Sequence, residues 1–201
     1  DTSAENRPTD VGGLKAIKDA TDVEKVVAAM RRQPLCEEVQ EHACRALRTL
    51  TWESNIRAGK VGAVEAVISA MRGHAGSAGV QEWACGALSG LIYESTANRT
   101  RAGYAGAAEA LVSAMRVHAG IEGVQDFACL ALYHLTVEET ESYTNQAVHA
   151  GAIEAVVAAM HRHTGNEGVQ ERGCWALCTL SYDSTENTTR AVNTGAIEAL
   201  V

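Results

Sequence analysis

Aromatic residues, prolines and long apolar runs are all scarce in this chain of 201 residues. Phe, Trp and Tyr together make up 4% of it, and its two prolines, Pro8 and Pro34, both precede the most regular part of the sequence. Ala, Gly and Val are abundant instead, which indicates helices that pack closely through small side chains. No apolar run approaches the roughly 20 residues that a membrane-spanning helix needs, so no membrane insertion is expected.

Positive charge and the motifs of common enzymes are missing too. The formal net charge of −8 argues against nucleic acid as a partner, because phosphate backbones need a concentrated basic face. There is no GxxxxGK[ST] or GxGxxG phosphate loop, and Ser, His and Asp stand in no catalytic arrangement. There is also no CxxC or HExxH motif that could supply metal ligands. We therefore expect no enzyme activity, cofactor, metal or small-molecule substrate.

The sequence does contain two phrases that recur with almost constant spacing. The phrases VQEHAC, VQEWAC, VQDFAC and VQERGC begin at Val39, Val80, Val124 and Val169, which are 41, 44 and 45 residues apart. A second phrase, GAVEAV, GAAEAL, GAIEAV or GAIEAL, begins at Gly62, Gly106, Gly151 and Gly195. Such a period predicts a solenoid, in which one supersecondary unit is repeated along an axis.

Each unit shows the apolar spacing of helices and none of the alternation of strands. The segment after VQ has an i, i+4, i+7, i+8, i+11 stripe, which predicts a helix about four turns long. One copy of this stripe consists of Val80, Ala84, Ala87, Leu88 and Leu91. A polar stretch, a short helix, a glycine and the GAIEAVVAAM helix follow, so the unit is predicted to contain three helices.

The repeats also predict the organisation of the chain. The expected parts are an irregular N-terminal segment 1–20 with LKAIKDA as a divergent first helix, a partial first repeat 21–53, full repeats 54–95, 96–139 and 140–183, and the start of a further, truncated repeat 184–201. The last phrase stops where earlier copies continue to a methionine, so the chain is expected to be a fragment of a longer array. This supports an alternative function, a structural or assembly subunit of a larger complex.

The two phrases resemble those of the armadillo repeat family. A unit of that family has a short first helix, a GAIPALV-type second helix and a VQEAALWALSNLA-type third helix; the matching phrases here are GAIEAVVAAM and VQERGCWALCTLSY. The resemblance covers roughly residues 20–201 and implies an all-α, right-handed superhelical α-solenoid of three-helix armadillo-type repeats. It also implies a protein-protein interaction scaffold, in which the third helices line a concave groove that holds a segment of another protein.

One specific activity of the family does not carry over. Importin-type peptide binding uses an Asn in each third helix, and the corresponding residues here are Thr49, Gly90, His134 and Thr179. It also uses a Trp one turn earlier, and the corresponding residues here are Arg45, Gly86, Leu130 and Trp175. The Asn ladder is absent and the Trp occurs once. Binding of nuclear-import cargo is therefore not expected.

We call the outward side of the third helices the third-helix face and expect it to bind the partner. Its members are Arg45, Arg48, Thr49 and Trp52, then Trp83, Gly86, Gly90 and Tyr93, then Phe127, Leu130, Tyr133 and His134, then Arg172, Trp175, Thr179 and Tyr182. Aromatic residues and Arg are enriched in interface hot spots. The alternative interpretation is that these aromatics pack between repeats. Gly86 and Gly90 would then permit close helix contact rather than form a shallow seat for a bulky partner group.

Three further residue types recur once per unit. The cysteines Cys44, Cys85, Cys129 and Cys174 would lie about 10 Å apart, too far for disulfides, so they are expected to be small buried apolar residues. Reduced thiols indicate an intracellular location, in the cytoplasm or the nucleus. His74, His118 and His163 are expected to interact with the free carbonyls at the ends of their own helices, and Glu65, Glu109, Glu154 and Glu198 with helix N-termini.

Overall fold

The computed structural model describes residues 22–137 and 141–199, and every regular element in these ranges is a helix. The helices are α2 (Val23–Arg32), α3 (Glu37–Lys60), α4 (Ala63–Gly73), α5 (Ala78–Ile92), α6 (Thr96–Tyr104), α7 (Ala107–Val117), α8 (Glu122–Thr136), α9 (Glu141–Ala150), α10 (Ala152–Arg162), α11 (Glu167–Ser181), α12 (Thr185–Asn193) and α13 (Ala196–Ala199). None of them is long and apolar enough to cross a membrane. The predicted irregular segment 1–20 lies outside the described residues.

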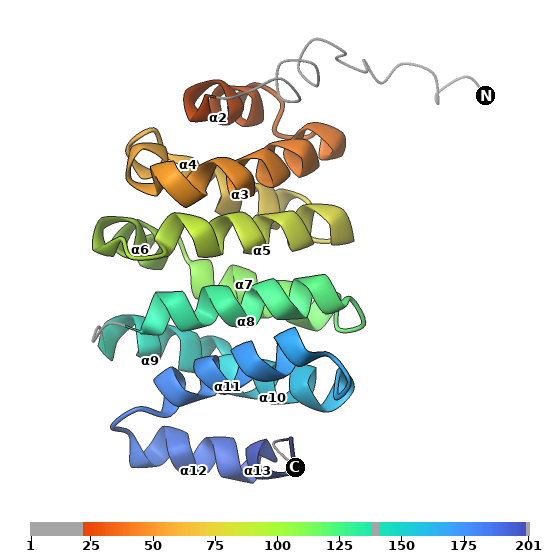
Figure 1. Cartoon of the computed structure of the whole chain (residues 1–201), viewed down its shortest axis with the longest axis vertical. Coiled ribbons are helices and arrows are strands. Elements are labelled where there is room, and N and C mark those ends of the chain that lie inside the picture. The colour runs from red at the N-terminus through yellow and green to blue at the C-terminus, as the bar shows by residue number, and fades with distance from the viewer. Residues whose placement is uncertain (1–21, 138–140, 200–201) are drawn as a thin grey trace, which may run out of the picture.

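The helices stack along one axis in the order in which they occur in the chain (Figure 1). The third helices of the units are the first part of α3 together with α5, α8 and α11, and they lie side by side on one face. Helices α4, α7 and α10 lie behind them (Figure 1). Because each unit packs mainly against its neighbours, the predicted all-α solenoid is confirmed.

Short polar side chains determine where two of the third helices begin. The Ser77 hydroxyl accepts a hydrogen bond from the backbone N–H of Val80 at 3.3 Å, and the Asn166 amide oxygen accepts one from Val169 at 3.0 Å. Each side chain satisfies an amide group that has no partner inside the first helical turn. Ser77 and Asn166 therefore act as the N-caps that start these helices.

The first unit differs from the others because its third helix and the next first helix are continuous. Helix α3 runs through both, and only Ser54 departs from helical geometry, with φ −138° and ψ 22°. Ser54 is also the residue at which the second repeat is predicted to start. A kink thus replaces the polar loop that separates the corresponding helices in later units.

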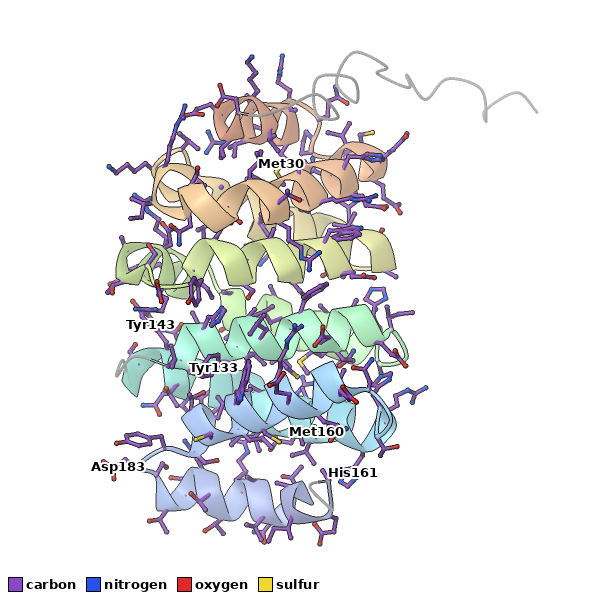
Figure 2. All side chains as sticks on the ribbon, viewed as in Figure 1. Met30, Tyr133, Tyr143, Met160, His161 and Asp183 are labelled. Atoms are coloured by element: carbon purple, nitrogen blue, oxygen red, sulfur yellow. The ribbon has the colours of Figure 1, made fainter. Side chains whose placement is uncertain are left out.

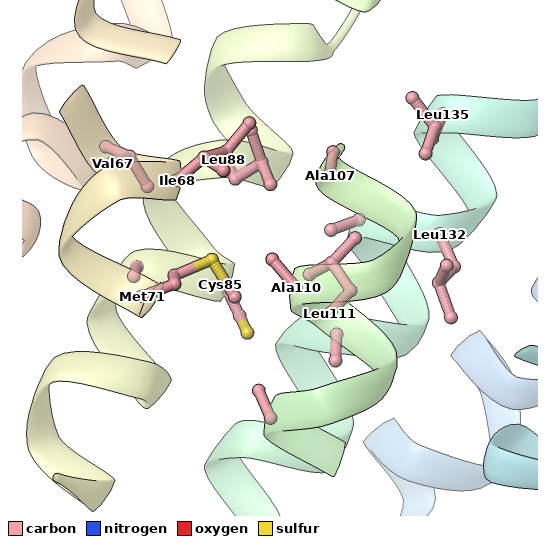
Figure 3. Packing of buried hydrophobic residues seen from close by; sticks show 14 of the residues in the cluster. Val67, Ile68, Met71, Cys85, Leu88, Ala107, Ala110, Leu111, Leu132 and Leu135 are labelled. Carbon is pink, nitrogen blue, oxygen red and sulfur yellow. The ribbon is translucent and has the colours of Figure 1, made fainter. Parts of the chain in front are cut away.

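A hydrophobic core extends through the described units and contains the residues predicted to lie inside. Every member of the predicted stripe Val80, Ala84, Ala87, Leu88 and Leu91 has 0% of its surface exposed. Figure 3 shows Leu88 of α5 among buried side chains of α4 and α7. The helical spacing in the sequence therefore identifies the buried side of each third helix.

All six cysteines are free, and three of the four recurring ones are fully buried. These are Cys44, Cys85 and Cys129, whereas Cys174 is half-buried and Cys178 is exposed. Burial raises the pKa of Cys44 and that of Cys129 to about 12. The buried thiols stay protonated near neutral pH and pack as small apolar groups.

The glutamine of each VQ phrase satisfies carbonyl groups at the end of the preceding second helix. The side-chain amides of Gln40, Gln81, Gln125 and Gln170 donate to the carbonyls of Met30, Met71, Met115 and Met160, at 2.8–3.1 Å. The same amides also donate to the carbonyls of Gln33, His74, His118 and His163. Gln40, Gln81 and Gln125 are buried, so water cannot take their place at these helix ends, whereas Gln170 is half-buried.

The recurring histidines bind a neighbouring unit, which differs from the prediction that they bind their own helix. The Nε2 atoms of His74, His118 and His163 lie 2.8–2.9 Å from the carbonyl oxygens of Pro34, Ala75 and Ala119. Each acceptor belongs to the corresponding loop of the preceding unit. The imidazole is long enough to reach past its own helix end, where the backbone N–H already bonds the last turn. We call these bonds the histidine ladder.

Bonds in the opposite direction come from the last turn of each second helix. Arg31, Arg72 and Arg116 donate to the carbonyls of Val61, Ala105 and Ala150 in the next unit, at 2.9, 2.6 and 3.2 Å. In the last unit His161, which Figure 2 labels, lies 3.1 Å from the carbonyl oxygen of Gly195. We call these bonds the arginine ladder. Together the two ladders join every described unit to its neighbours.

Gly62, Gly106 and Gly151 must be glycine for two reasons. Their φ angles are +81°, +75° and +90°, which other residues rarely adopt. A Cβ atom on any of them would also lie within 2.4 Å of a guanidinium nitrogen of the arginine ladder. The glycine that opens each GA phrase therefore permits both the turn and the bond to the neighbouring unit.

Two of the four glutamates of the GA phrases form ion pairs in addition to their expected position at a helix N-terminus. Glu65 lies 3.4 Å from Arg101, and Glu154 lies 2.5 Å from Arg190. Each arginine belongs to the first helix of the next unit. Partial burial alone would raise the pKa of Glu154, but the hydrogen bonds from Arg190 lower it overall. Exposed pairs of this kind stabilise a fold by about 0–1 kcal/mol each.

Candidate protein-binding face

The structure places the predicted members of the third-helix face in one row along α3, α5, α8 and α11. Six are exposed: Arg45, Arg48, Thr49, Tyr93, Trp175 and Tyr182. Eight are half-buried: Trp83, Gly90, Phe127, Leu130, Tyr133, His134, Arg172 and Thr179. Gly86 is buried, and the side chain of Trp52 lies outside the described part of the structure.

Two arginines of α3 lie against aromatic rings of the next two units. The Arg45 guanidinium carbon is 5.0 Å from the centroid of the Trp83 ring. The Arg48 guanidinium carbon is 5.5 Å from Trp83 and 4.3 Å from Phe127. Cation–π contacts of this length hold both guanidinium groups over the rings. Arg48 thus connects three successive units across the face.

Gly86 does not form the open seat that the sequence suggested. A Cβ atom at this position would lie 2.8 Å from Cδ of Arg48 and 3.1 Å from its Nε. At Gly90 a Cβ atom would lie 2.8 Å from the hydroxyl of Thr51. The space over both glycines is therefore occupied by side chains of this chain, as the alternative explanation, close contact between helices, requires.

Arg172 differs from the two α3 arginines because it has an acidic partner. It lies 5.7 Å from the Phe127 ring and forms an ion pair with Asp126 of α8. Burial raises the pKa of Asp126, although Arg172 acts in the opposite direction. The sequence analysis missed Asp126, but its place in VQDFAC, directly before an aromatic member of the face, could have indicated it.

A second group of rings lies nearer the C-terminal ends of the third helices. The ring centroids of Tyr93 and His134 are 5.0 Å apart, and those of Tyr133 and Trp175 are 5.6 Å apart. Tyr133, labelled in Figure 2, also lies 5.3 Å from His134. These side chains therefore pack between units while Tyr93 and Trp175 keep 44% and 41% of their surface exposed. Packing and partner binding do not exclude each other here.

His134 also contacts Ser89 of α5, which the sequence analysis did not include. Its Nδ1 lies 3.0 Å from the Ser89 hydroxyl and 3.2 Å from the Ser89 carbonyl oxygen. Burial lowers the pKa of His134, and the positive charges of Arg99 and Arg172 act in the same direction. Imidazole in this place is therefore mainly neutral at neutral pH.

We expect His134 to make the fold less stable in mild acid. The folded protein resists protonation of His134, whereas the unfolded chain takes up the proton near pH 6.5, the ordinary value. The free energy of unfolding should therefore fall as the pH drops below about 6.5. Urea unfolding of wild type and His134→Gln over a pH series measures this effect, with the exposed His149→Gln as control. Equal pH slopes for wild type and His134→Gln would contradict the prediction.

A hollow of about 690 Å³, with both polar and apolar walls, lies at the end of the face, between the last two units. Its walls come from the ends of α8 and α11 and from α9 and α12. Thr179 and Tyr182 of the predicted face line it, and the Thr136 and Thr179 hydroxyls lie 2.6 Å apart. Within the described residues, no group of three or more His, Cys, Asp or Glu side chains could hold a metal ion.

Solved structures of repeat proteins resemble this arrangement, whereas no protein-family model matches the chain and no curated protein matches its sequence. An engineered protein solved by crystallography superposes with a TM-score of 0.75 and 24% identity over 92% of this chain and 76% of that chain. A designed armadillo repeat protein in complex with the peptide (KR)4 has a TM-score of 0.71 and 19% identity over 92% of this chain and 75% of that chain. The helix order, the stacked third helices and these structural similarities all lead to the same conclusion. The fold of this chain is that of an armadillo repeat array.

Proposed function

We propose that the chain is a non-enzymatic scaffold that binds a segment of another protein along the third-helix face. The observation that carries this proposal is the row of Arg and aromatic side chains that remain partly exposed along the third helices, although several of them stack between units. Tyr182 is 74% exposed, Tyr93 44% and Trp175 41%. Surfaces that combine exposed aromatics with Arg are typical of binding hot spots. The designed armadillo repeat protein, which has the same fold, is in complex with a peptide.

The partner segment would be held by side-chain anchors rather than by a ladder of amides. Thr49, Gly90, His134 and Thr179 stand where importin-type binding places Asn, so no regular row of side-chain amides holds a peptide backbone. The partly exposed rings of Trp83, Phe127 and Trp175 offer apolar contact instead. We also propose that the scaffold acts inside the cell, because all six cysteines are free thiols.

An unbiased peptide selection tests this function. Random peptides displayed on phage would be selected on the folded chain, and the affinities of the selected peptides measured for three proteins: wild type, Trp175→Ala and Tyr104→Ala. Tyr104 is 87% exposed on α6, away from the third-helix face, and serves as the matched control. We expect Trp175→Ala to weaken binding about tenfold or more, as for a hot-spot aromatic, and Tyr104→Ala to change it little.

Two results would contradict the proposal. One is a selection that yields no peptide at all, and the other is a set of peptides that respond equally to both substitutions. Far-UV circular dichroism of each variant shows whether the helices are intact, so a loss of fold cannot be mistaken for a loss of binding.

A further inference from the structure

Arg45 and Arg48 lack the acidic partners that four other arginines of the described units have. Arg57, Arg101, Arg172 and Arg190 each form an ion pair with a carboxylate. The guanidinium groups of Arg45 and Arg48 form neither an ion pair nor a hydrogen bond with any described residue. Both are exposed on the third-helix face. Two positive charges therefore lie on the same part of the face; Arg48 also acts electrostatically on Asp126, but that carboxylate forms its ion pair with Arg172.

The rings hold these two charges in place. A guanidinium that stacks on an aromatic ring uses its flat side, which leaves the N–H groups at its edge available to a second partner. Arg45 and Arg48 both lie within 5.5 Å of the Trp83 centroid, so both charges are held against the same ring. A fixed pair of this kind loses little side-chain freedom when it binds a carboxylate.

We infer that the part of the face formed by Arg45, Arg48, Trp83 and Phe127, here called the arginine platform, binds an acidic stretch of the partner protein. Carboxylates of Asp or Glu would accept hydrogen bonds from the two guanidinium groups, as Arg and carboxylate do in bidentate pairs. An apolar neighbour in the segment would pack on the exposed ring surface. This inference rests on the proposed function and specifies that the bound segment of the partner is negatively charged.

The charge of the platform is opposite to that of the molecule as a whole. The chain carries a formal net charge of −8. An acidic segment would be repelled by most of its surface and attracted at the platform, so the platform would determine where the segment binds. The peptide bound by the designed armadillo repeat protein, (KR)4, is basic. The segment inferred here has the opposite charge.

Gly86 provides a way to disturb the platform without changing a residue that touches the peptide. The Arg48 side chain crosses α5 directly over Gly86, and a methyl group there would lie 2.8 Å from its Cδ. Gly86→Ala should therefore displace Arg48 from Trp83 and Phe127. Alanine has a higher helix propensity than glycine, so weaker binding by this variant is not expected to come from unfolding of the helix. Gly73→Ala at the exposed end of α4, with nothing within 4 Å, is the matched control.

The experiment uses two labelled peptides and fluorescence anisotropy. The acidic probe alternates Glu with Gly around one central Leu, and the basic probe has Lys in place of every Glu. We expect the acidic probe to bind about tenfold or more tightly than the basic one, and this preference to shrink at high salt. Arg45→Ala, Arg48→Ala and Gly86→Ala should each weaken binding of the acidic probe about five- to tenfold, whereas Gly73→Ala should leave it unchanged.

Several outcomes would overturn the inference. They are equal binding of both probes, tighter binding of a single-stranded oligonucleotide of the same length, or an acidic-probe affinity that does not change in Arg48→Ala and Gly86→Ala. If these occur while Trp175→Ala still weakens the phage-selected peptides, the scaffold function stands and only the acidic partner is wrong. If Trp175→Ala has no effect either, the proposed function itself fails.

Discussion

Replacement of Leu88 by alanine is expected to lower the free energy of unfolding by about 2–5 kcal/mol. Leu88 has 0% of its surface exposed and lies in α5 between second helices of two units (Figure 3). Removal of its side-chain atoms leaves a cavity that the surrounding alanines and valines are too small to fill. Because the core is continuous, both neighbouring units should lose stability.

Urea unfolding followed by circular dichroism measures this effect, and Leu35→Ala is the control. Leu35 is 89% exposed between α2 and α3, so the same chemical change there should alter the free energy of unfolding by less than about 0.5 kcal/mol. Similar losses for both variants would show that Leu88 is not a core residue.

Gln125→Met is expected to lower the free energy of unfolding by about 1–3 kcal/mol. Gln125 is 1% exposed, and its amide donates to the carbonyls of Met115 and His118 at 3.1 and 2.9 Å. Methionine has a similar length and no donor, so it leaves these carbonyls without their bonds. His118 also accepts a bond from the backbone of Ile121, so most of the cost arises at Met115.

Gln146→Met is the appropriate comparison for this second variant. Among the described residues, Gln146 of α9 donates one long bond, 3.5 Å to the Ser142 hydroxyl, and this bond is exposed. Its replacement should therefore change stability little. If thermal and urea unfolding show that both methionine variants are as stable as wild type, the glutamine of the VQ phrase does not stabilise the end of the second helix.

The general architecture could be predicted from the sequence because it depends on features that recur. The stripe that contains Leu88 identifies the buried side of a helix, and the glycine that opens each GA phrase marks a turn. Both properties are local, so spacing alone reveals them. The histidine ladder is different: its acceptors Pro34, Ala75 and Ala119 are about one repeat away in sequence, and only the stacking of units brings them close.

The candidate site was predictable as a row of residues but not as a set of contacts. Helical spacing placed Trp83, Phe127 and Trp175 on one side of the third helices. It could not show that Arg48 extends across Gly86, because the direction of a long side chain depends on the next unit. The same reason explains why Ser89 was not recognised as a neighbour of His134.

The histidine and arginine ladders also have a consequence for evolution. Each bond joins one module to the next, and every internal module carries both a donor for one neighbour and an acceptor for the other. An in-frame gene duplication of one complete module would therefore create new junctions in which each donor still meets an acceptor. Proteins with this construction can grow longer by copying whole segments, whereas a single-core protein must redesign its interior to grow.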